Sequence, residues 1–350
     1  MVKEKQRNFS LDILRIISAM CVVLLHTSAY YWYISPIGER DWIISGVYDV
    51  FSRFAVPVFV MISGALFLSG DEKPNIRRIV IHNFLRILII FLLWSCIYGL
   101  INSFSVGIAN IGVKQILKMC LAGKYHLWFL PMIGGIYLVS PLLYVMVNGA
   151  GEKMLRYYMM VFFCLQIIRS TLITVINNPE LVGVLEMWNI PMVCTYISYF
   201  ILGYYLVRYG ISSKCWLLIK IIALPAFILN ASAVIYLSKR NGGPDIEFAN
   251  SFGIGTFIIA IFIFVGINKI VMKLQLRGFI GKVLTNVSKD TLGVYLLHLA
   301  VLEIAVPELC KYVNIPTVIA IPLYTIGIFV VCILIIALLR RIPKVGRYIC

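Results

Sequence analysis

FSLDILRIISAMCVVLLHTSAYYWY, the stretch from Phe9 to Tyr33, is long enough to cross a bilayer as a single helix. It nevertheless contains Asp12, Arg15 and His26, which are ionisable side chains that a simple membrane anchor would lack. Arg15 and His26 are eleven residues apart, so they share one helix face, about 16 Å apart along the axis. Small or slim side chains follow this face. The stretch therefore predicts one wall of a narrow polar passage through a membrane.

The composition excludes an ordinary soluble protein. Hydrophobic residues make up 61% of the chain and charged residues only 13%, about half the charged fraction of a soluble domain. The net charge of +16 lies in short basic clusters between apolar segments, a pattern that reports membrane topology and predicts no nucleic-acid partner. The nine cysteines form no CxxC pair and no Cys/His cluster, so no metal site is expected.

Apolar segments of spanning length predict an all-α membrane bundle of about ten transmembrane helices. The predicted spans are 11–33, 43–69, 79–102, 126–147, 154–176, 191–208, 215–237, 252–272, 290–306 and 316–339. Most of the 31 Lys and Arg residues fall on the side that holds both termini, which predicts that both termini are cytoplasmic. The whole chain, 1–350, is expected to form one membrane domain without an appended soluble domain.

Three connecting segments carry further predictions. Residues 103–125 are partly apolar and predict a short helix lying on the outer membrane surface. The segment 177–190 contains Glu180, Glu186 and Trp188 but no Lys or Arg; it fits an outer loop near a polar acceptor and fits an ordinary interfacial loop equally well. The segment 238–251 contains Asn-Gly-Gly-Pro-Asp, which predicts a tight turn.

Five patterns occur in order along almost the whole chain. They are Arg15 with His26, FAVPVFVMISG at 54–64, HLWFLPMIGGIYLVSP at 126–141, YFILGYY at 199–205 and GVYLLH at 293–298. Together they resemble the acyltransferase-3 family of integral membrane acyltransferases, and most closely its stand-alone envelope sugar O-acetyltransferases. One position departs from the family pattern: Asn83 stands in the third span where a basic residue is common.

The resemblance implies an activity, a donor and a location. The expected reaction moves an acyl group, usually acetyl, from cytoplasmic acetyl-CoA to a hydroxyl of a cell-envelope glycan or of its lipid-linked sugar precursor. Acetyl-CoA would be a co-substrate rather than a resident cofactor. The expected location is a bacterial plasma membrane.

Acyl transfer from a thioester needs a base for the attacking hydroxyl and a group that holds the donor. His26 is the candidate base, because an imidazole has an ordinary pKa close to neutral pH. The alternative is a histidine that only ties two helices together. Arg15 is predicted to hold CoA, because a guanidinium matches phosphate oxygens. Alternatively, Arg15 extends to the membrane interface or pairs with Asp12.

Other arginines near the spans have two interpretations each. Arg78 and Arg86 lie on the same predicted side as Arg15 and are candidate phosphate contacts, or they only anchor the helix. Arg77 is interpreted as an anchor alone. Arg53 is a candidate for binding the acceptor, and the alternative is an ion pair with Asp49 one turn earlier.

Four more side chains are predicted to bind the substrate. His126 and Trp128 begin the fourth span at its outer end, where a tryptophan either stacks on a sugar or anchors the helix at the interface. His298 and Glu303 lie in the ninth span and are candidates for relaying a proton or binding a hydroxyl. The alternative for this last pair is a structural tie between helices.

A rival function is a transporter or flippase for a glycan or lipid-linked saccharide, in which the polar passage conducts substrate and His26 only gates it. The absence of a convincing internal repeat weighs against transporter folds built from two related halves. A weaker alternative is the membrane half of an amino-acid sensing or racemase system. The missing soluble catalytic domain argues against it.

Overall fold

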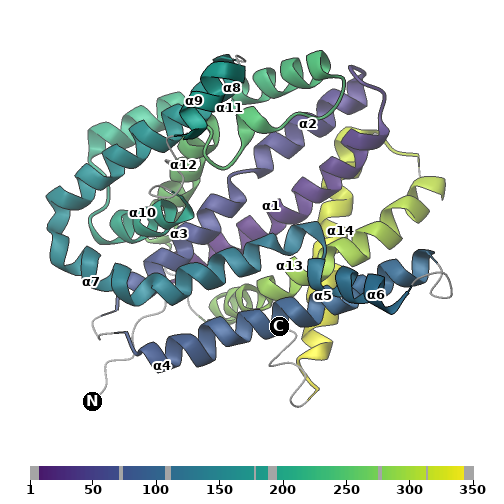
Figure 1. Ribbon diagram of the computed structural model, residues 1–350, viewed down its shortest axis with the longest axis horizontal. Coiled ribbons are helices and arrows are strands. Elements are labelled where there is room, and N and C mark those ends of the chain that lie inside the picture. The colour runs from purple at the N-terminus through teal and green to yellow at the C-terminus, as the bar shows by residue number, and fades with distance from the viewer. Residues whose placement is uncertain are drawn as a thin grey trace. The chain divides into compact units, whose positions relative to one another are not determined.

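The computed structural model describes residues 8–70, 74–106, 112–176, 179–187, 195–274, 278–312 and 314–342. Within these residues every regular element is a helix and no β-strand occurs (Figure 1). In this part of the chain, eight helical segments are long and apolar enough to cross a membrane. The protein is therefore a polytopic helical bundle, which confirms the predicted fold class.

The described chain divides into two compact units, and each is taken by itself. The larger unit comprises Met1–Ser69 and Ala150–Ile333, and the smaller comprises Gly70–Gly149 and Leu334–Cys350. Helices of the larger unit are α1 (Phe9–Ile34), α2 (Arg40–Ser52), α3 (Ala55–Leu68), η4 (Phe163–Ile168), α8 (Arg169–Ile176), α9 (Pro179–Met187), α10 (Tyr196–Arg208), α11 (Ser213–Asn241), η6 (Glu247–Ala249), α12 (Ile254–Val271) and α13 (Gly278–Tyr312). Helices of the smaller unit are α4 (Ile76–Arg78), η1 (Ile79–Phe84), α5 (Leu85–Val106), α6 (Val113–Ala122) and η3 (Tyr125–Trp128), while α7 (Phe129–Phe162) and α14 (Thr317–Leu339) contribute to both.

Helix α1 is the element around which the larger unit packs. The Asn8 side chain caps its first turn by accepting a hydrogen bond from the Ser10 backbone N–H at 3.1 Å. Asp12 in the same turn suits the positive end of the helix dipole. The helix contacts α2, α3, α12 and α13, and Figure 1 shows it in purple, running beside α2 and α13.

The apolar core beside α1 joins the first helix to the last two. Its buried members are Ala19, Val23, Val294, Leu302, Val306, Ala320, Tyr324, Ile328, Phe329 and Cys332. They come from α1, α13 and α14, which are remote in sequence. Burial of this apolar surface holds α1 and α13 together and thereby fixes which of their side chains meet.

The second predicted span is interrupted. Helix α2 ends at Ser52, and α3 begins at Ala55. Pro57 lacks the backbone N–H that would otherwise donate to the Arg53 carbonyl four residues earlier, so the regular hydrogen-bond ladder is broken at this point. The break lies beside Arg53.

Helices α3 and α10 cross at very close range. A Cβ atom added to Gly64 would lie 1.7 Å from the Phe200 carbonyl oxygen, and one added to Gly203 would lie 1.9 Å from the Met61 carbonyl oxygen. Only glycine permits such an approach of two backbones. The crossing brings together 54–64 and 199–205, two of the five family-like blocks.

Three of the ten predicted spans differ from the eight helical segments found among the described residues. The spans 126–147 and 154–176 lie within one segment of 52 residues, Tyr125–Ile176, about twice the length that one crossing needs. The non-helical Gly151, at φ 69° and ψ 169°, falls between them, where the sequence predicts a connection. The span 191–208 corresponds to the 13-residue α10, with 191–194 outside the described residues. The count of ten stays a prediction.

Two further elements can be compared with the predictions. Helix α6 confirms that a short helix forms within 103–125; its place at a membrane surface stays a prediction. Helix α13 has 35 residues and extends beyond the predicted span 290–306 at both ends.

Candidate active site

In the structure, two histidines that are far apart in the sequence lie side by side. His26 of α1 and His298 of α13 have ring centroids 5.1 Å apart with the ring planes tilted by 34°. His298 is fully buried, whereas His26 is only partly buried. His26 is thus the more exposed residue of the pair.

Hydrogen bonds fix the proton on the His298 ring. Its Nδ1 lies 2.7 Å from the Tyr295 carbonyl oxygen and 3.2 Å from the Val294 carbonyl oxygen. Carbonyl oxygens only accept, so Nδ1 carries the hydrogen. The neutral ring then has its lone pair on Nε2. This arrangement holds the ring beside His26 in one tautomer.

A second polar contact joins the same two helices nearer their beginnings. The Ser288 hydroxyl of α13 donates to Asp12 Oδ1 of α1 at 2.7 Å, and both residues are buried. Asp12 precedes His26, and Ser288 precedes His298, so α1 and α13 run parallel. Sequence reasoning considered Asp12 only as a local partner of Arg15 and missed this tie, because nothing in the sequence states which helix packs against α1.

Arg15 is half-buried on α1, on the same face as His26 and about 16 Å nearer the start of the helix. Ser18 lies between them, and its Oγ is buried without a hydrogen-bond partner among the described residues. The small and polar side chains thus form a row on this face of α1, and their role as the wall of a passage stays a prediction. The row begins with a guanidinium and ends at the paired imidazoles.

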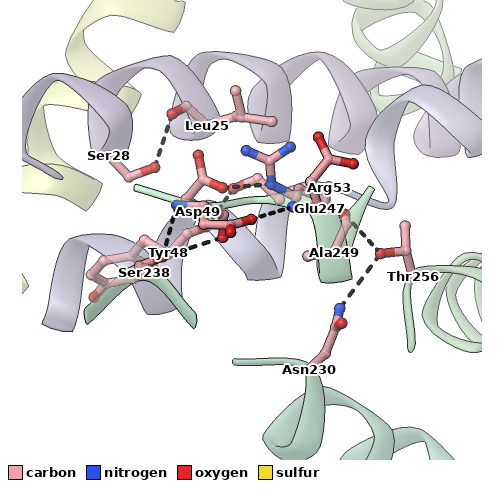
Figure 2. A network of polar contacts seen from close by, with 12 residues as sticks. Leu25, Ser28, Tyr48, Asp49, Arg53, Asn230, Ser238, Glu247, Ala249 and Thr256 are labelled. Carbon is pink, nitrogen blue, oxygen red and sulfur yellow. Dashed lines mark hydrogen bonds and ion pairs between the residues drawn. The ribbon is translucent and has the colours of Figure 1, made fainter. Parts of the chain in front are cut away.

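Arg53 forms the ion pair that was one of its two predicted interpretations. Its Nε donates to Asp49 Oδ1 at 2.6 Å (Figure 2). The Asp49 side chain is 2% exposed and the Arg53 side chain 15% exposed. The two Nη groups of Arg53 make no further hydrogen bond to the described residues. Pairing with Asp49 thus leaves Arg53 able to bind a second group.

In the smaller unit, Arg78 and Arg86 are exposed and flank the π-helix η1. A π turn takes about one more residue than an α turn, so these arginines are close to two turns apart and share a face. Arg78 lines a hollow of about 430 Å³ together with Asn75, Arg77, Ile81 and His82. Arg77, interpreted from the sequence as an anchor alone, therefore also faces this basic hollow.

His126 and Trp128 occupy one turn, η3, but differ in exposure. His126 is 2% exposed, and its ring meets Tyr98 edge to face at a centroid distance of 5.1 Å. Trp128 is 45% exposed, which suits either an interface anchor or a stacking surface. Their role toward a sugar stays a prediction.

The last predicted pair, His298 and Glu303, is divided between two sides of α13. His298 is fully buried, whereas Glu303 is exposed. Five residues correspond to about 140° around a helix, so this spacing points the side chains apart. Among the described residues, no three His, Cys, Asp or Glu side chains form a possible metal site.

Comparison with known families matches residues 8–337 to the model described as an acyltransferase domain. The match covers nearly the whole chain, including Arg15, His26 and His298. No curated protein and no solved structure matches the chain.

Proposed function

Because the chain belongs to the acyltransferase-3 family and is a membrane acyltransferase, we propose that it moves an acetyl group from cytoplasmic acetyl-CoA to a hydroxyl of a cell-envelope glycan or lipid-linked sugar. The location that goes with this reaction is a bacterial plasma membrane. The proposal depends most on one observation: His26 is partly open, paired with His298 at 5.1 Å, and on the same face as Arg15.

In the proposed donor site, Arg15 holds the phosphates of CoA near the cytoplasmic end of α1. The planar guanidinium suits bidentate pairing with phosphate oxygens. The pantetheine arm then extends along the face of α1 past Ser18, and the thioester reaches His26. For Arg78 and Arg86, a contact with CoA stays a separate prediction.

In the proposed reaction, His26 takes the proton from the acceptor hydroxyl while the oxygen attacks the thioester carbonyl carbon. The tetrahedral intermediate collapses, the carbon–sulfur bond breaks and the CoA thiolate leaves. His26 returns its proton to that thiolate. His298, which is held by two backbone carbonyls, keeps the His26 ring in place.

The test uses the purified protein in nanodiscs, with acetyl-CoA as the probe and release of the free thiol as the readout. We expect slow hydrolysis by the unmodified protein. His26→Ala and His26→Gln should lower it by roughly 10²–10⁴-fold, the usual contribution of a general base. Arg15→Gln should mainly raise the KM for acetyl-CoA. Tyr33→Ala, at a side chain that is 72% exposed on the same helix, is the matched control.

Two results would contradict the proposal. One is a well-folded His26→Ala protein, with an unchanged melting temperature, that keeps full activity. The other is movement of a saccharide across vesicles containing the protein without consumption of acetyl-CoA, which would favour the flippase. Comparing O-acetyl groups in envelope glycans from cells with and without the gene then identifies the acceptor.

A further inference from the structure

A second polar site lies in the larger unit, and neither His26 nor His298 lines it. A hollow of about 260 Å³ is lined by Ile173 and Thr174 of α8, Val182 of α9, Leu237, Arg240 and Asn241 of α11, and Asp245 and Glu247 of the following loop. One part of the lining is charged or amide-bearing and the other is aliphatic. Such a mixed lining suits a ligand that has both hydroxyl groups and a C–H face.

The polar side of this hollow is built by hydrogen bonds around Asp245. Its backbone N–H donates to Ser238 Oγ at 2.8 Å, and its carboxylate accepts from the Glu247 backbone N–H at 3.0 Å and from Asn241 Nδ2 at 2.6 Å. Asn250 Nδ2 donates to the Glu247 carbonyl oxygen at 2.7 Å. The Asn241 and Asp245 side chains and the backbone at Glu247 are therefore held in position before any ligand arrives.

Two opposite charges face the hollow without meeting. Arg240 has one weak contact, from Nε to Asn241 Oδ1 at 3.4 Å, and its Nη groups make no hydrogen bond or ion pair with the described residues. The Glu247 carboxylate also has no partner there, and Figure 2 shows it without a dashed line. Elsewhere in this unit Arg53 pairs with Asp49. The Arg240 Nη groups and the Glu247 carboxylate are therefore available to donate to and accept from a ligand.

The loop also connects this hollow to the C-terminal end of α1, which the sequence predicts to be the outer end. Phe248 and Ala249, which directly follow Glu247, are buried against Trp32 of α1 and Trp42 of α2. Trp32 is six residues, or about 9 Å, beyond His26 along the helix. The hollow therefore lies on the side of the bundle where the sequence predicts that the acceptor approaches.

From these observations we propose that this hollow binds one sugar unit of the acceptor glycan. Its volume of about 260 Å³ lies below the roughly 300–1,000 Å³ of pockets that enclose a whole drug-sized ligand, which fits one unit of a longer chain. Glu247 accepts from sugar hydroxyls, Arg240 donates to them, and the aliphatic residues pack on the ring. The inference rests on the proposed glycan acceptor.

The experiment compares Glu247→Gln and Arg240→Gln with matched controls from the same unit. Glu308→Gln controls for the loss of a carboxylate, since Glu308 is exposed and paired with Lys311 at 2.6 Å. Lys239→Gln controls for the loss of a cation beside Arg240. Each variant is expressed in cells lacking the native gene for measurement of glycan O-acetyl content. Each is also purified for acetyl-CoA hydrolysis and melting temperature.

We expect the two hollow variants to lower glycan O-acetylation at least about tenfold, as when a bound hydroxyl loses its polar partner, with unchanged acetyl-CoA hydrolysis and melting temperature. Normal O-acetylation in both would overturn the inference and leave the proposed function standing. Loss of hydrolysis at a normal melting temperature would overturn it too, because the hollow would then serve the donor reaction. If the unmodified protein neither hydrolyses acetyl-CoA nor acetylates glycan, the proposed function itself fails.

Discussion

Single residues in this protein show how a buried charge limits substitution. Asp49 is buried and has Arg53 as its ion-pair partner, whereas surface pairs such as Arg156–Glu152 are open to solvent. Breaking a buried pair leaves one charge without compensation, while replacing both charges by apolar side chains does not. Substitutions in the Asp49–Arg53 pair can therefore distinguish a structural role of Arg53 from a role in binding the acceptor.

The prediction at this scale concerns Asp49→Asn. It should destabilise the protein by about 3–5 kcal/mol, because the mostly buried Arg53 loses its counter-charge. The double variant Asp49→Leu with Arg53→Met should lose less stability than Asp49→Asn alone. Thermal unfolding in detergent measures both, with the exposed Glu152→Gln as the control.

Acyl transfer by the stable double variant then reports on Arg53. A reduced rate is expected if its Nη groups contact the acceptor. A double variant that is both stable and fully active would reduce Arg53 to a structural partner of Asp49. A stable Asp49→Asn protein would show that the pair is not buried as described.

Sequence spacing determined which local side-chain relations could be predicted. The Asp49–Arg53 pair was foreseen as one of two alternatives, because residues four apart share a helix face. The meeting of His26 with His298 was not foreseen, because spacing within one helix does not specify its packing partner. The hollow at Arg240 and Glu247 was missed because the loop was interpreted only as a tight turn.

At the scale of elements, the close crossing of α3 and α10 is the clearest case of sequence specifying packing. Gly64 and Gly203 remove the side chains that would keep the two backbones apart. Motif resemblance identified both blocks, yet only the structure shows that they pack against each other. The short α10 and the π-helices η1 and η4 were not predicted, because apolar periodicity does not distinguish them from ordinary spanning helices.

The element-scale prediction is that Gly64→Ala and Gly203→Ala each destabilise the bundle by at least about 1–3 kcal/mol, since each added Cβ meets a carbonyl oxygen rather than a movable side chain. Gly327→Ala in α14 is the control, because a Cβ there meets nothing within 4 Å. Melting temperatures in detergent provide the comparison. Equal melting temperatures for all three variants would show that α3 and α10 do not approach this closely.

At the scale of the whole molecule, the helical bundle could be predicted from composition and hydrophobic segments alone. Orientation in the membrane depends on the distribution of Lys and Arg and stays a prediction. Helix α11 offers a direct test, because its 29 residues correspond to about 43 Å, more than the thickness of the hydrocarbon core. A membrane-spanning α11 has its two ends accessible from different sides of the membrane.

We predict that Gly243→Cys, just after α11, reacts with a membrane-impermeant maleimide in right-side-out vesicles. Ser213→Cys, at the start of α11, should react only after the vesicles are opened. The unmodified protein, with its native cysteines, gives the background. Labelling of both positions from the same side would contradict a membrane-spanning α11, and reversed labelling would invert the predicted orientation.

The tie between Asp12 and Ser288 spans 276 residues of sequence, and this has a consequence for biosynthesis. The first helix is inserted with its ionisable side chains long before α13 has been synthesised, so the nascent protein is inactive through most of translation. Closing so large a loop is slow. A truncation that removes α13 should therefore leave α1 without its packing partner. Cellular quality control can recognise such an incompletely assembled helix.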